Sequence, residues 1–262
     1  MQEFKFPDIQ GIKKAYDEDG FVIVREVFDL DFISEVNSHI DWLIEKHPDL
    51  ETENLGHWLV TEDPFWYRFF SDDRLLKLAG ALIGPNIALF AADYICKQPG
   101  TGRPLNWHQD AHYWTLKAME IIAVWFAVTD SKRDNGCVRM IPGTHKGGLF
   151  DHVDSDSQNA LHTQLPDSAV NEQEAVDIEL EPGDISIHNP ILIHGSNPNH
   201  SDRWRRGGSI QYMTPTTHIA DPNWPSAFLL SGDAQEGINT YKPRPHFVEG
   251  EHMPFVGYKD YL

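Results

Sequence analysis

The chain has 262 residues, 40% of them hydrophobic and 23% charged, and its formal net charge is −19. This acidic balance argues against nucleic acid and against anionic membranes as partners, because both are bound through positive charge. Two cysteines are too few for a disulfide framework, the N-terminus does not resemble a signal peptide, and no apolar run is long enough to span a membrane. The sequence therefore predicts a soluble cytoplasmic protein.

The first 85 residues predict mainly helices. Residues 8–20 indicate a short helix that ends at Gly20, and the run FVIVREVF at 21–28 is typical of a strand. Apolar residues at helical spacing predict two longer helices, over 30–47 and over about 72–83.

From residue 86 onward, short β-rich runs are separated by turn signals, a pattern that favours a sandwich or barrel over alternating βαβ units. Residues 150–174 are polar and aperiodic, and we expect a long surface loop or lid there. We expect one domain over 1–262, in which 1–85 form a helical cover with one strand, 86–215 form the core, and 216–262 pack over it as irregular structure.

Three metal-ligand side chains stand out. His108 and Asp110 are two residues apart, so in a strand they would point to the same face. His194 lies far along the chain and would come from another strand, with Gly183-Asp184 forming the turn into that strand. Two histidines and one carboxylate form the facial triad of non-haem iron(II) oxygenases. His188 is the main competitor of His194, because HNPILIH offers both imidazoles.

Arg205 follows His194 by 11 positions. A buried arginine suits a carboxylate, because its planar guanidinium can donate two parallel hydrogen bonds. Strand alternation favours Arg205, Gly207, Ser209 and Gln211 on one face, which leaves the rival Arg206 on the other face.

These motifs resemble the phytanoyl-CoA dioxygenase family, which includes phytanoyl-CoA and ectoine hydroxylases. The matching stretches are GFVIVREVF, WHQDAHYW, AVWFAVTDSKRDNGCVRMIPGTHKGG, PGDISIHNPILIHGSNPN and WRRGGSIQYMTP, which together span about residues 20–215. The resemblance implies a mainly β double-stranded β-helix (a jelly-roll, cupin-like barrel) with the N-terminal helices packed outside.

The resemblance also implies the cofactors and the residues that hold them. Iron(II) would be bound by His108, Asp110 and His194, and the reaction would use dioxygen and 2-oxoglutarate and release succinate and carbon dioxide. The co-substrate 2-oxoglutarate would be bound by Arg205, Ser196, Trp125 and Lys97. Because the carboxylate Asp110 is present, hydroxylation of an unactivated carbon is favoured over halogenation.

The substrate pocket is less clearly indicated. Candidate lining residues are Asn106, Tyr113, Trp114, Arg103 and Arg139. Each has a structural alternative: Asn106 could bind the backbone, the aromatics could be core residues, and Arg139 could belong to an ion pair.

No basic patch for the phosphates of coenzyme A is evident, so a small polar or zwitterionic metabolite is favoured: an amino acid, an ectoine-like compound or an aminophosphonate such as 2-aminoethylphosphonate. Two alternatives stay open. One is an acyl-CoA or other lipid-like hydroxylase of the same family, and the other is a non-catalytic or cupin-like metal-binding jelly-roll protein. The sequence does not indicate an oligomeric state.

Overall fold

The computed structural model of the chain describes residues 3–5, 8–59, 61–156, 158–224 and 227–262. Among these residues, four α-helices lie in the N-terminal third: α1 (Ile9–Asp19), α2 (Leu30–Lys46), α3 (Pro64–Phe70) and α4 (Asp73–Ile83). None of the described helices is both long and apolar enough to cross a membrane.

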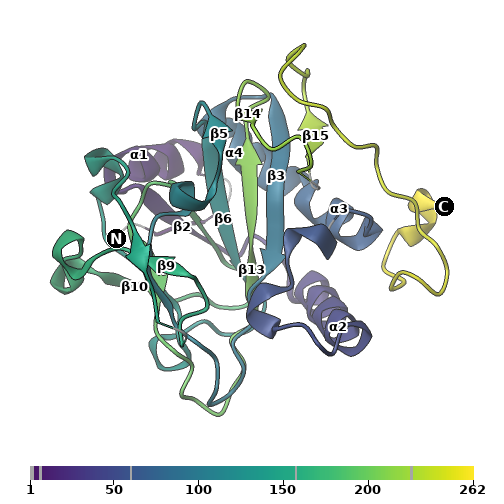
Figure 1. Cartoon of the computed structure of the whole chain (residues 1–262). Coiled ribbons are helices and arrows are strands. Elements are labelled where there is room, and N and C mark those ends of the chain that lie inside the picture. The colour runs from purple at the N-terminus through teal and green to yellow at the C-terminus, as the bar shows by residue number, and fades with distance from the viewer. Residues whose placement is uncertain (1–2, 6–7, 60, 157, 225–226) are drawn as a thin grey trace.

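The rest of the chain is mainly β (Figure 1). A larger sheet has the order β1-β2-β11-β6-β13-β3-β15, built from β1 (Glu3–Lys5), β2 (Phe21–Arg25), β11 (Ile185–His188), β6 (Ile121–Ala127), β13 (Gly207–Met213), β3 (Ile87–Tyr94) and β15 (Phe228–Ser231). A smaller sheet has the order β10-β7-β12-β4, built from β10 (Val176–Ile178), β7 (Val138–Met140), β12 (His194–Ser196) and β4 (Leu105–His108). Two further pairs join β14 (His218–Ile219) to β5 (Leu116–Lys117) and β8 (Val153–Asp154) to β9 (Thr163–Gln164).

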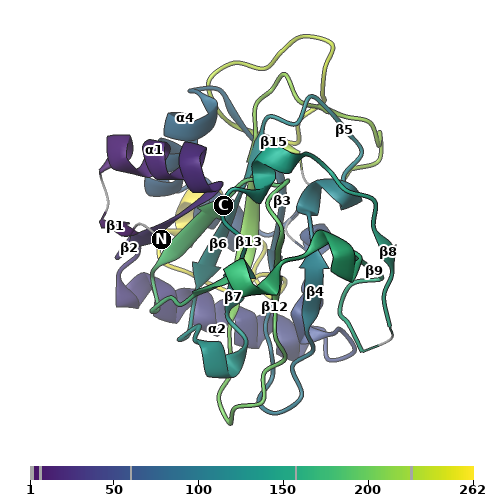
Figure 2. The ribbon, with the colours of Figure 1, turned by 90° about the vertical axis from the view of Figure 1, so that its left-hand side faces the viewer.

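The two main sheets face each other, and Figure 2 shows β7, β12 and β4 in front of β6, β13 and β3. Between β3 and β13 the chain passes repeatedly from one sheet to the other, as in a jelly roll. This is the expected double-stranded β-helix with helices outside it.

The buried strands of the larger sheet are covered on both faces, which explains their continuous apolar sequences. In β6, Ile122, Val124 and Phe126 pack into the cluster that holds the helices, whereas Trp125 and Ala127 pack toward the smaller sheet. The alternation along one strand therefore separates a helix-facing core from the interior of the barrel.

The helices begin where the sequence provides a cap. Asp29 accepts a hydrogen bond from the Phe32 amide (2.8 Å) at the start of α2, and Gly20 ends α1 in the left-handed conformation with φ 82°. Helix α3, an aromatic segment that the hydrophobic pattern did not single out, adds Phe65, Trp66 and Phe69 to the same core.

Three expectations need correction. Residues 150–174 contain the paired strands β8 and β9, and Leu165 anchors the segment because its amide donates to the Trp107 carbonyl (2.7 Å). The C-terminal segment adds β15 to the edge of the larger sheet beside β3. The turn at Gly183-Asp184 leads into β11, which ends at His188, and a further turn through Asn189 and Pro190 comes before the strand that carries His194.

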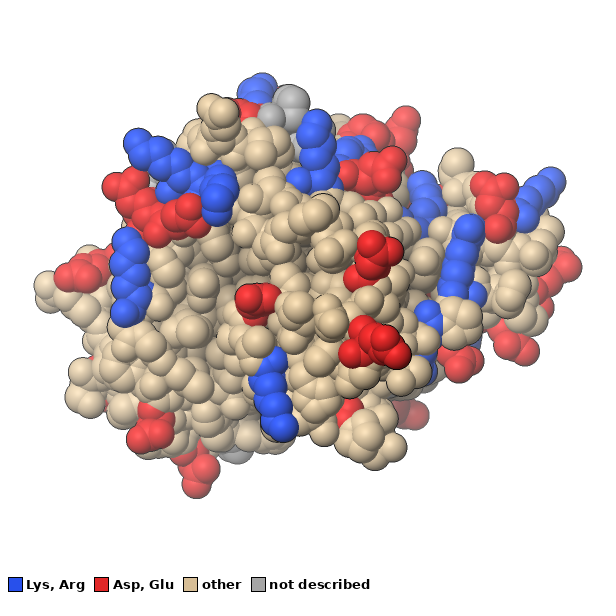
Figure 3. Space-filling model, turned by 90° about the horizontal axis from the view of Figure 1, so that it is seen from above, with Lys and Arg blue, Asp and Glu red and all other residues tan. Residues whose placement is uncertain are grey.

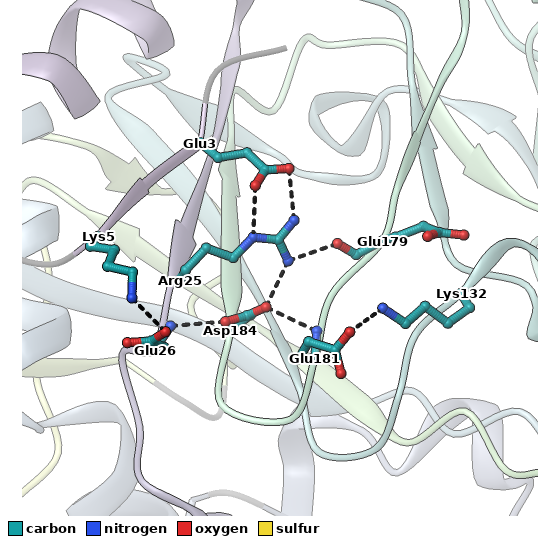
Figure 4. A network of polar contacts seen from close by, with 8 residues as sticks. All are labelled: Glu3, Lys5, Arg25, Glu26, Lys132, Glu179, Glu181 and Asp184. Atoms are coloured by element: carbon teal, nitrogen blue, oxygen red, sulfur yellow. Dashed lines mark hydrogen bonds and ion pairs between the residues drawn. The ribbon is translucent and has the colours of Figure 1, made fainter.

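Asp184 secures the turn into β11 (Figure 4). Its carboxylate is 3% exposed and accepts hydrogen bonds from the Glu26 amide (2.8 Å), the Glu181 amide (2.9 Å) and the Arg25 guanidinium (2.6 Å). These bonds tie β2 to the start of β11. Nearby, Lys132 and Glu181 form an ion pair at the exposed rim of the same network.

Replacing Asp184 with alanine should lower the free energy of unfolding by about 2–4 kcal/mol, because it leaves two backbone amides without their acceptor and removes one of the acceptors of the Arg25 guanidinium. Urea unfolding followed by circular dichroism would measure the change. Glu181→Ala is the matched control, and it should cost less than about 1 kcal/mol, since its pair with Lys132 is largely exposed to water. Equal costs for the two variants would contradict this role of Asp184.

Candidate active site

Three ligand-type side chains meet between the two sheets. The antiparallel pairing of β12 with β4 places His194 opposite His108, and Asp110 follows His108 by two residues. One ligand atom from each of the three side chains lies within 4.8 Å of the other two. The structure therefore brings together the expected two-histidine, one-carboxylate set, and its donor chemistry fits iron(II).

Both imidazoles are oriented by the backbone. The Nδ1 of His108 donates to the Asn106 carbonyl (2.7 Å), and the Nδ1 of His194 donates to the Leu192 carbonyl (2.9 Å). Because a carbonyl only accepts, each Nδ1 carries a proton, and Nε2 is the nitrogen that would bind a metal once it has released its own proton. Each Nε2 faces the Oδ1 of Asp110, at 3.5 Å from His108 and 3.4 Å from His194.

The expectation that His108 and Asp110 share one face of a strand is wrong. Strand β4 ends at His108, and Asp110 begins a 3-10 turn, Asp110–Tyr113. The Ala111 amide of this turn donates to the Pro190 carbonyl (3.0 Å). The carboxylate therefore reaches the histidines through a turn and not through strand alternation.

Gln109 holds this turn in place. Its side chain is fully buried, and its amide nitrogen donates to the carbonyls of Gly148 (2.8 Å) and Ile191 (2.6 Å). Its amide oxygen accepts from the Phe150 N–H (2.8 Å). One side chain thus joins the ligand-bearing turn to the loop after residue 147 and to the loop before β12.

A fourth imidazole, that of His188, lies on the other side of the carboxylate. Its Nε2 is 3.3 Å from the Oδ2 of Asp110, and burial lowers its pKa. His188 therefore does not replace His194 in the three-residue set but contacts the oxygen that His108 and His194 leave free.

Asp110 is held ionised by these neighbours. Burial alone would raise its pKa, but the charge of His194 and hydrogen bonds from His108, His188 and His194 hold the pKa well below its usual value. The site therefore presents a carboxylate, as a divalent cation requires.

Arg205 lines the same cavity as the three ligand-type side chains and is 1% exposed. Its guanidinium lies 4.7 Å from the centre of the Trp125 ring, and its Nη2 donates to the Ile95 carbonyl (3.2 Å). Burial lowers its pKa to about 10, so it stays charged at neutral pH. Its Nε and the Nε1 of Trp125 are buried and have no hydrogen-bond partner among the described residues. Two unmet donors beside a buried cation fit a carboxylate ligand.

The neighbouring Arg206 points elsewhere. Its guanidinium pairs with Asp41 (2.7 Å) and with Asn37 (2.9 Å), both on α2. Arg205, by contrast, lines the cavity that contains the three ligand-type side chains.

Lys97 and Ser196 form a second polar group near Arg205. The ammonium of Lys97 is fully buried and donates to the Ser196 hydroxyl (2.7 Å) and to the Asn197 carbonyl (2.5 Å). Burial and the charge of Arg205 lower the pKa of Lys97 well below its usual value. Ser196 lines the cavity, and Lys97 lies behind it, bridged through its backbone to Arg205.

The cavity has a volume of about 190 Å³ and is lined from both sheets. Of the expected pocket residues, Tyr113 and Trp114 line it. The other three do not line the cavity, and their side chains contact other residues. Asn106 donates to Gln164 (2.5 Å), Arg103 pairs with Glu51 (2.5 Å), and Arg139 pairs with Asp177 (3.4 Å). Arg103 lies before β4, and the pairing of β4 with β12 shifts register between His108 and Leu105, so Asn106 does not follow His108 into the cavity. Arg139 follows Val138, which lines the cavity, and therefore projects from the other face of β7.

Several residues that were not expected in the pocket also line it, among them Asp93, Leu161, Ser209 and Gln211. Ser209 and Gln211 could have been found, because they alternate with Arg205 on the face already expected to point inward. The position of Asp93 depends on the pairing of β3 with β13, and the position of Leu161 depends on the path of a loop. No short sequence pattern predicts either position.

Comparisons with known proteins agree with this arrangement. The family described as "Phytanoyl-CoA dioxygenase (PhyH)" matches residues 16–207. The human protein named "Phytanoyl-CoA dioxygenase, peroxisomal" is 26% identical over 86% of this chain and 72% of its own length. The Arabidopsis thaliana protein named "Phytanoyl-CoA dioxygenase" is 30% identical over 70% of this chain and 65% of its own length.

Solved structures share the fold. The non-heme monooxygenase ThoJ superposes with a TM-score of 0.74 at 24% identity, over 89% of this chain and 88% of that one. EctD from S. alaskensis, solved with 2-oxoglutarate and 5-hydroxyectoine, gives a TM-score of 0.67 at 19% identity, over 89% of this chain and 86% of that one. Since the family match covers most of the chain, the protein belongs to the phytanoyl-CoA dioxygenase family and is an iron- and 2-oxoglutarate-dependent dioxygenase.

Proposed function

We propose that His108, Asp110 and His194 bind the iron(II) and that the enzyme hydroxylates an unactivated carbon of a small polar or zwitterionic metabolite. One observation carries the metal assignment: the three ligand atoms lie within 4.8 Å of one another. The Nδ1 atoms of both histidines donate hydrogen bonds to backbone carbonyls, so each Nε2 is the nitrogen that faces the metal. Iron(II) bound with 2-oxoglutarate supplies the activation of dioxygen, and 2-oxoglutarate leaves as succinate and carbon dioxide.

The protein contributes the positions of the bound groups and a cavity lined from both sheets. We propose that Arg205 binds the distal carboxylate of 2-oxoglutarate, with Trp125 and Ser196 beside it. The unmet donors of Arg205 and Trp125 support this assignment, because a carboxylate would satisfy both. Lys97 supports Ser196 from behind by donating a hydrogen bond to its hydroxyl.

The small-metabolite assignment rests on the size and charge of the molecule. The cavity of about 190 Å³ is small. On the face seen in Figure 3, Lys and Arg side chains lie among Asp and Glu side chains and do not form a continuous basic surface for the phosphates of coenzyme A.

An acyl-CoA substrate is the second candidate. The curated relatives bear the name of phytanoyl-CoA dioxygenase. In addition, Leu149, Phe150 and Val153 are exposed apolar side chains in the loop that Gln109 anchors to the ligand-bearing turn. Membership of a dioxygenase family argues against a non-catalytic role. The cytoplasmic location stays a prediction, and the human relative is named peroxisomal.

His194→Ala should reduce the iron(II) bound by the protein by at least about tenfold, because it removes one of three ligands. Anaerobic titration with iron(II) and 2-oxoglutarate, followed by the weak visible charge-transfer band of the chelate, would measure this. His200→Ala is the control, since His200 is an exposed histidine six residues further along the chain. An unchanged stoichiometry in His194→Ala would show that this imidazole is not a ligand.

Arg205→Ala should raise the 2-oxoglutarate concentration needed for half-maximal chelate absorbance by about 100-fold, because the distal carboxylate loses a buried, charged partner. Arg205→Lys should recover part of the affinity, since lysine keeps the charge but not the planar pair of donors. Arg206→Ala is the matched control: it removes a neighbouring arginine that contacts α2 and should leave 2-oxoglutarate binding within about twofold. A larger effect of Arg206→Ala than of Arg205→Ala would move the binding role to the other arginine.

A further inference from the structure

The two oxygens of the Asp110 carboxylate have different neighbours. Oδ1 faces the Nε2 atoms of His108 (3.5 Å) and His194 (3.4 Å), whereas Oδ2 lies 3.3 Å from the Nε2 of His188. Within the described part of the chain, no other donor is bonded to Oδ2. One oxygen is therefore directed to the proposed metal position, and the other is bonded to a third imidazole.

His188 projects from a well-supported strand. It is the last residue of β11, where it is opposite Phe21 on β2 and opposite Ala123 on β6, and it is 4% exposed. The amide of the next residue, Asn189, donates to the Gly20 carbonyl (2.8 Å). A strand paired on both sides holds a side chain more precisely than the 3-10 turn that follows β4 can do alone.

The segment after His188 is also bonded to the segment that carries Asp110. The Ala111 amide donates to the Pro190 carbonyl (3.0 Å), so one backbone bond and one side-chain bond join the same two segments. The backbone bond fixes how close the segments lie. It does not fix the rotation of the carboxylate, because the terminal torsion of an aspartate is broad. The hydrogen bond from His188 supplies that second restraint.

An imidazole suits this role chemically. An ionised carboxylate only accepts hydrogen bonds, so the Nε2 of His188 carries a proton and is not available to a metal while it donates. Its Nδ1 is buried and has no partner among the described residues, so a second proton there would be an unmet donor. A neutral donor of this kind restrains the carboxylate without cancelling the negative charge that a divalent cation requires.

We propose that His188 is a positioning residue, which holds the Asp110 carboxylate so that only one of its oxygens faces the metal. The inference rests on the proposed function, because it takes His108, Asp110 and His194 as the ligands. A facial triad in which each side chain gives one atom leaves open positions for the co-substrates. A carboxylate that rotated freely would turn away from the metal or place both oxygens on it and take up one of these positions.

Iron(II) titration in the presence of 2-oxoglutarate, followed anaerobically by the chelate band, tests this role without turnover. His188→Phe keeps a planar ring but removes the donor, and it should weaken iron(II) binding by about 10- to 100-fold. His188→Gln places an amide N–H close to the position of Nε2 and should recover a large part of that loss. Recovery by glutamine separates the hydrogen bond from a packing role of the ring.

His39→Phe is the matched control. His39 is also fully buried and bonded to a carboxylate, that of Asp63 (2.9 Å), but it lies on α2 and does not line the cavity. Its replacement should lower the free energy of unfolding and leave iron(II) binding within about twofold of the wild type, because distant sites act independently.

NMR of the histidine ring nitrogens in the wild type keeps the test decisive if His188→Phe does not fold. Zinc(II), which is diamagnetic, takes the place of iron(II) in this measurement. The Nε2 of His188 should carry a proton and its Nδ1 should not. His108 and His194 should show the opposite pattern, with a protonated Nδ1 and a zinc-bound Nε2.

The outcomes separate the two proposals. Unchanged iron(II) binding in His188→Phe, an equal loss in His188→Phe and His188→Gln, or a His188 imidazole bound to zinc would overturn the positioning role. A chelate band that is present in the wild type and lost in His194→Ala would keep the proposed function in each of these cases. No chelate band in folded, iron-replete wild-type protein would overturn the proposed function, and the positioning role with it.

Discussion

The pairing of β4 with β12 places His108 opposite His194 across the smaller sheet, and the candidate active site depends on this register. Side chains alternate along a strand, so a slip of one residue would turn one of the two imidazoles away from the barrel interior. The register is secured on both sides, because β12 also pairs with β7, with His194 opposite Met140, a fully buried core residue. Packing in the barrel core thus fixes the distance between two candidate metal ligands.

The carboxylate of Asp110 is positioned by side-chain hydrogen bonds and not by strand pairing. Asp110 lies beyond the end of β4, where a ladder of backbone hydrogen bonds no longer holds the chain. Gln109 takes over that role through three hydrogen bonds to backbone groups of distant loops. Because the same side chain also contacts the loop after residue 147, the site geometry is joined to the apolar loop at Leu149 and Phe150. A change in that loop would reach Asp110 through this buried side-chain amide.

The same cavity joins the candidate co-substrate site to the candidate metal site, because Arg205 and Trp125 line it together with His108, Asp110 and His194. In a buried cavity charges are weakly screened, so the guanidinium of Arg205 selects the orientation of an anionic ligand as well as its affinity.

The sequence by itself determined much of this protein. Its β-branched runs and turn signals predicted a sandwich or barrel, and its helical spacing predicted α1, α2 and α4. The motifs carrying His108, Asp110, His194 and Arg205 indicated the family, and the family resemblance implied the double-stranded β-helix. These are local patterns, in which spacing and residue type carry the information. Even the inward face of Ser209 and Gln211 followed from simple alternation.

Only the tertiary structure decided the rest. Asp110 reaches its neighbours through a turn held by Gln109, and His188 contacts the same carboxylate from a third strand. Asp93 enters the cavity because β3 pairs with β13 in one register, whereas Asn106, Arg103 and Arg139 are drawn to partners outside it. These placements depend on which distant segments lie side by side, and the free energy of those contacts is not encoded in any short stretch of residues.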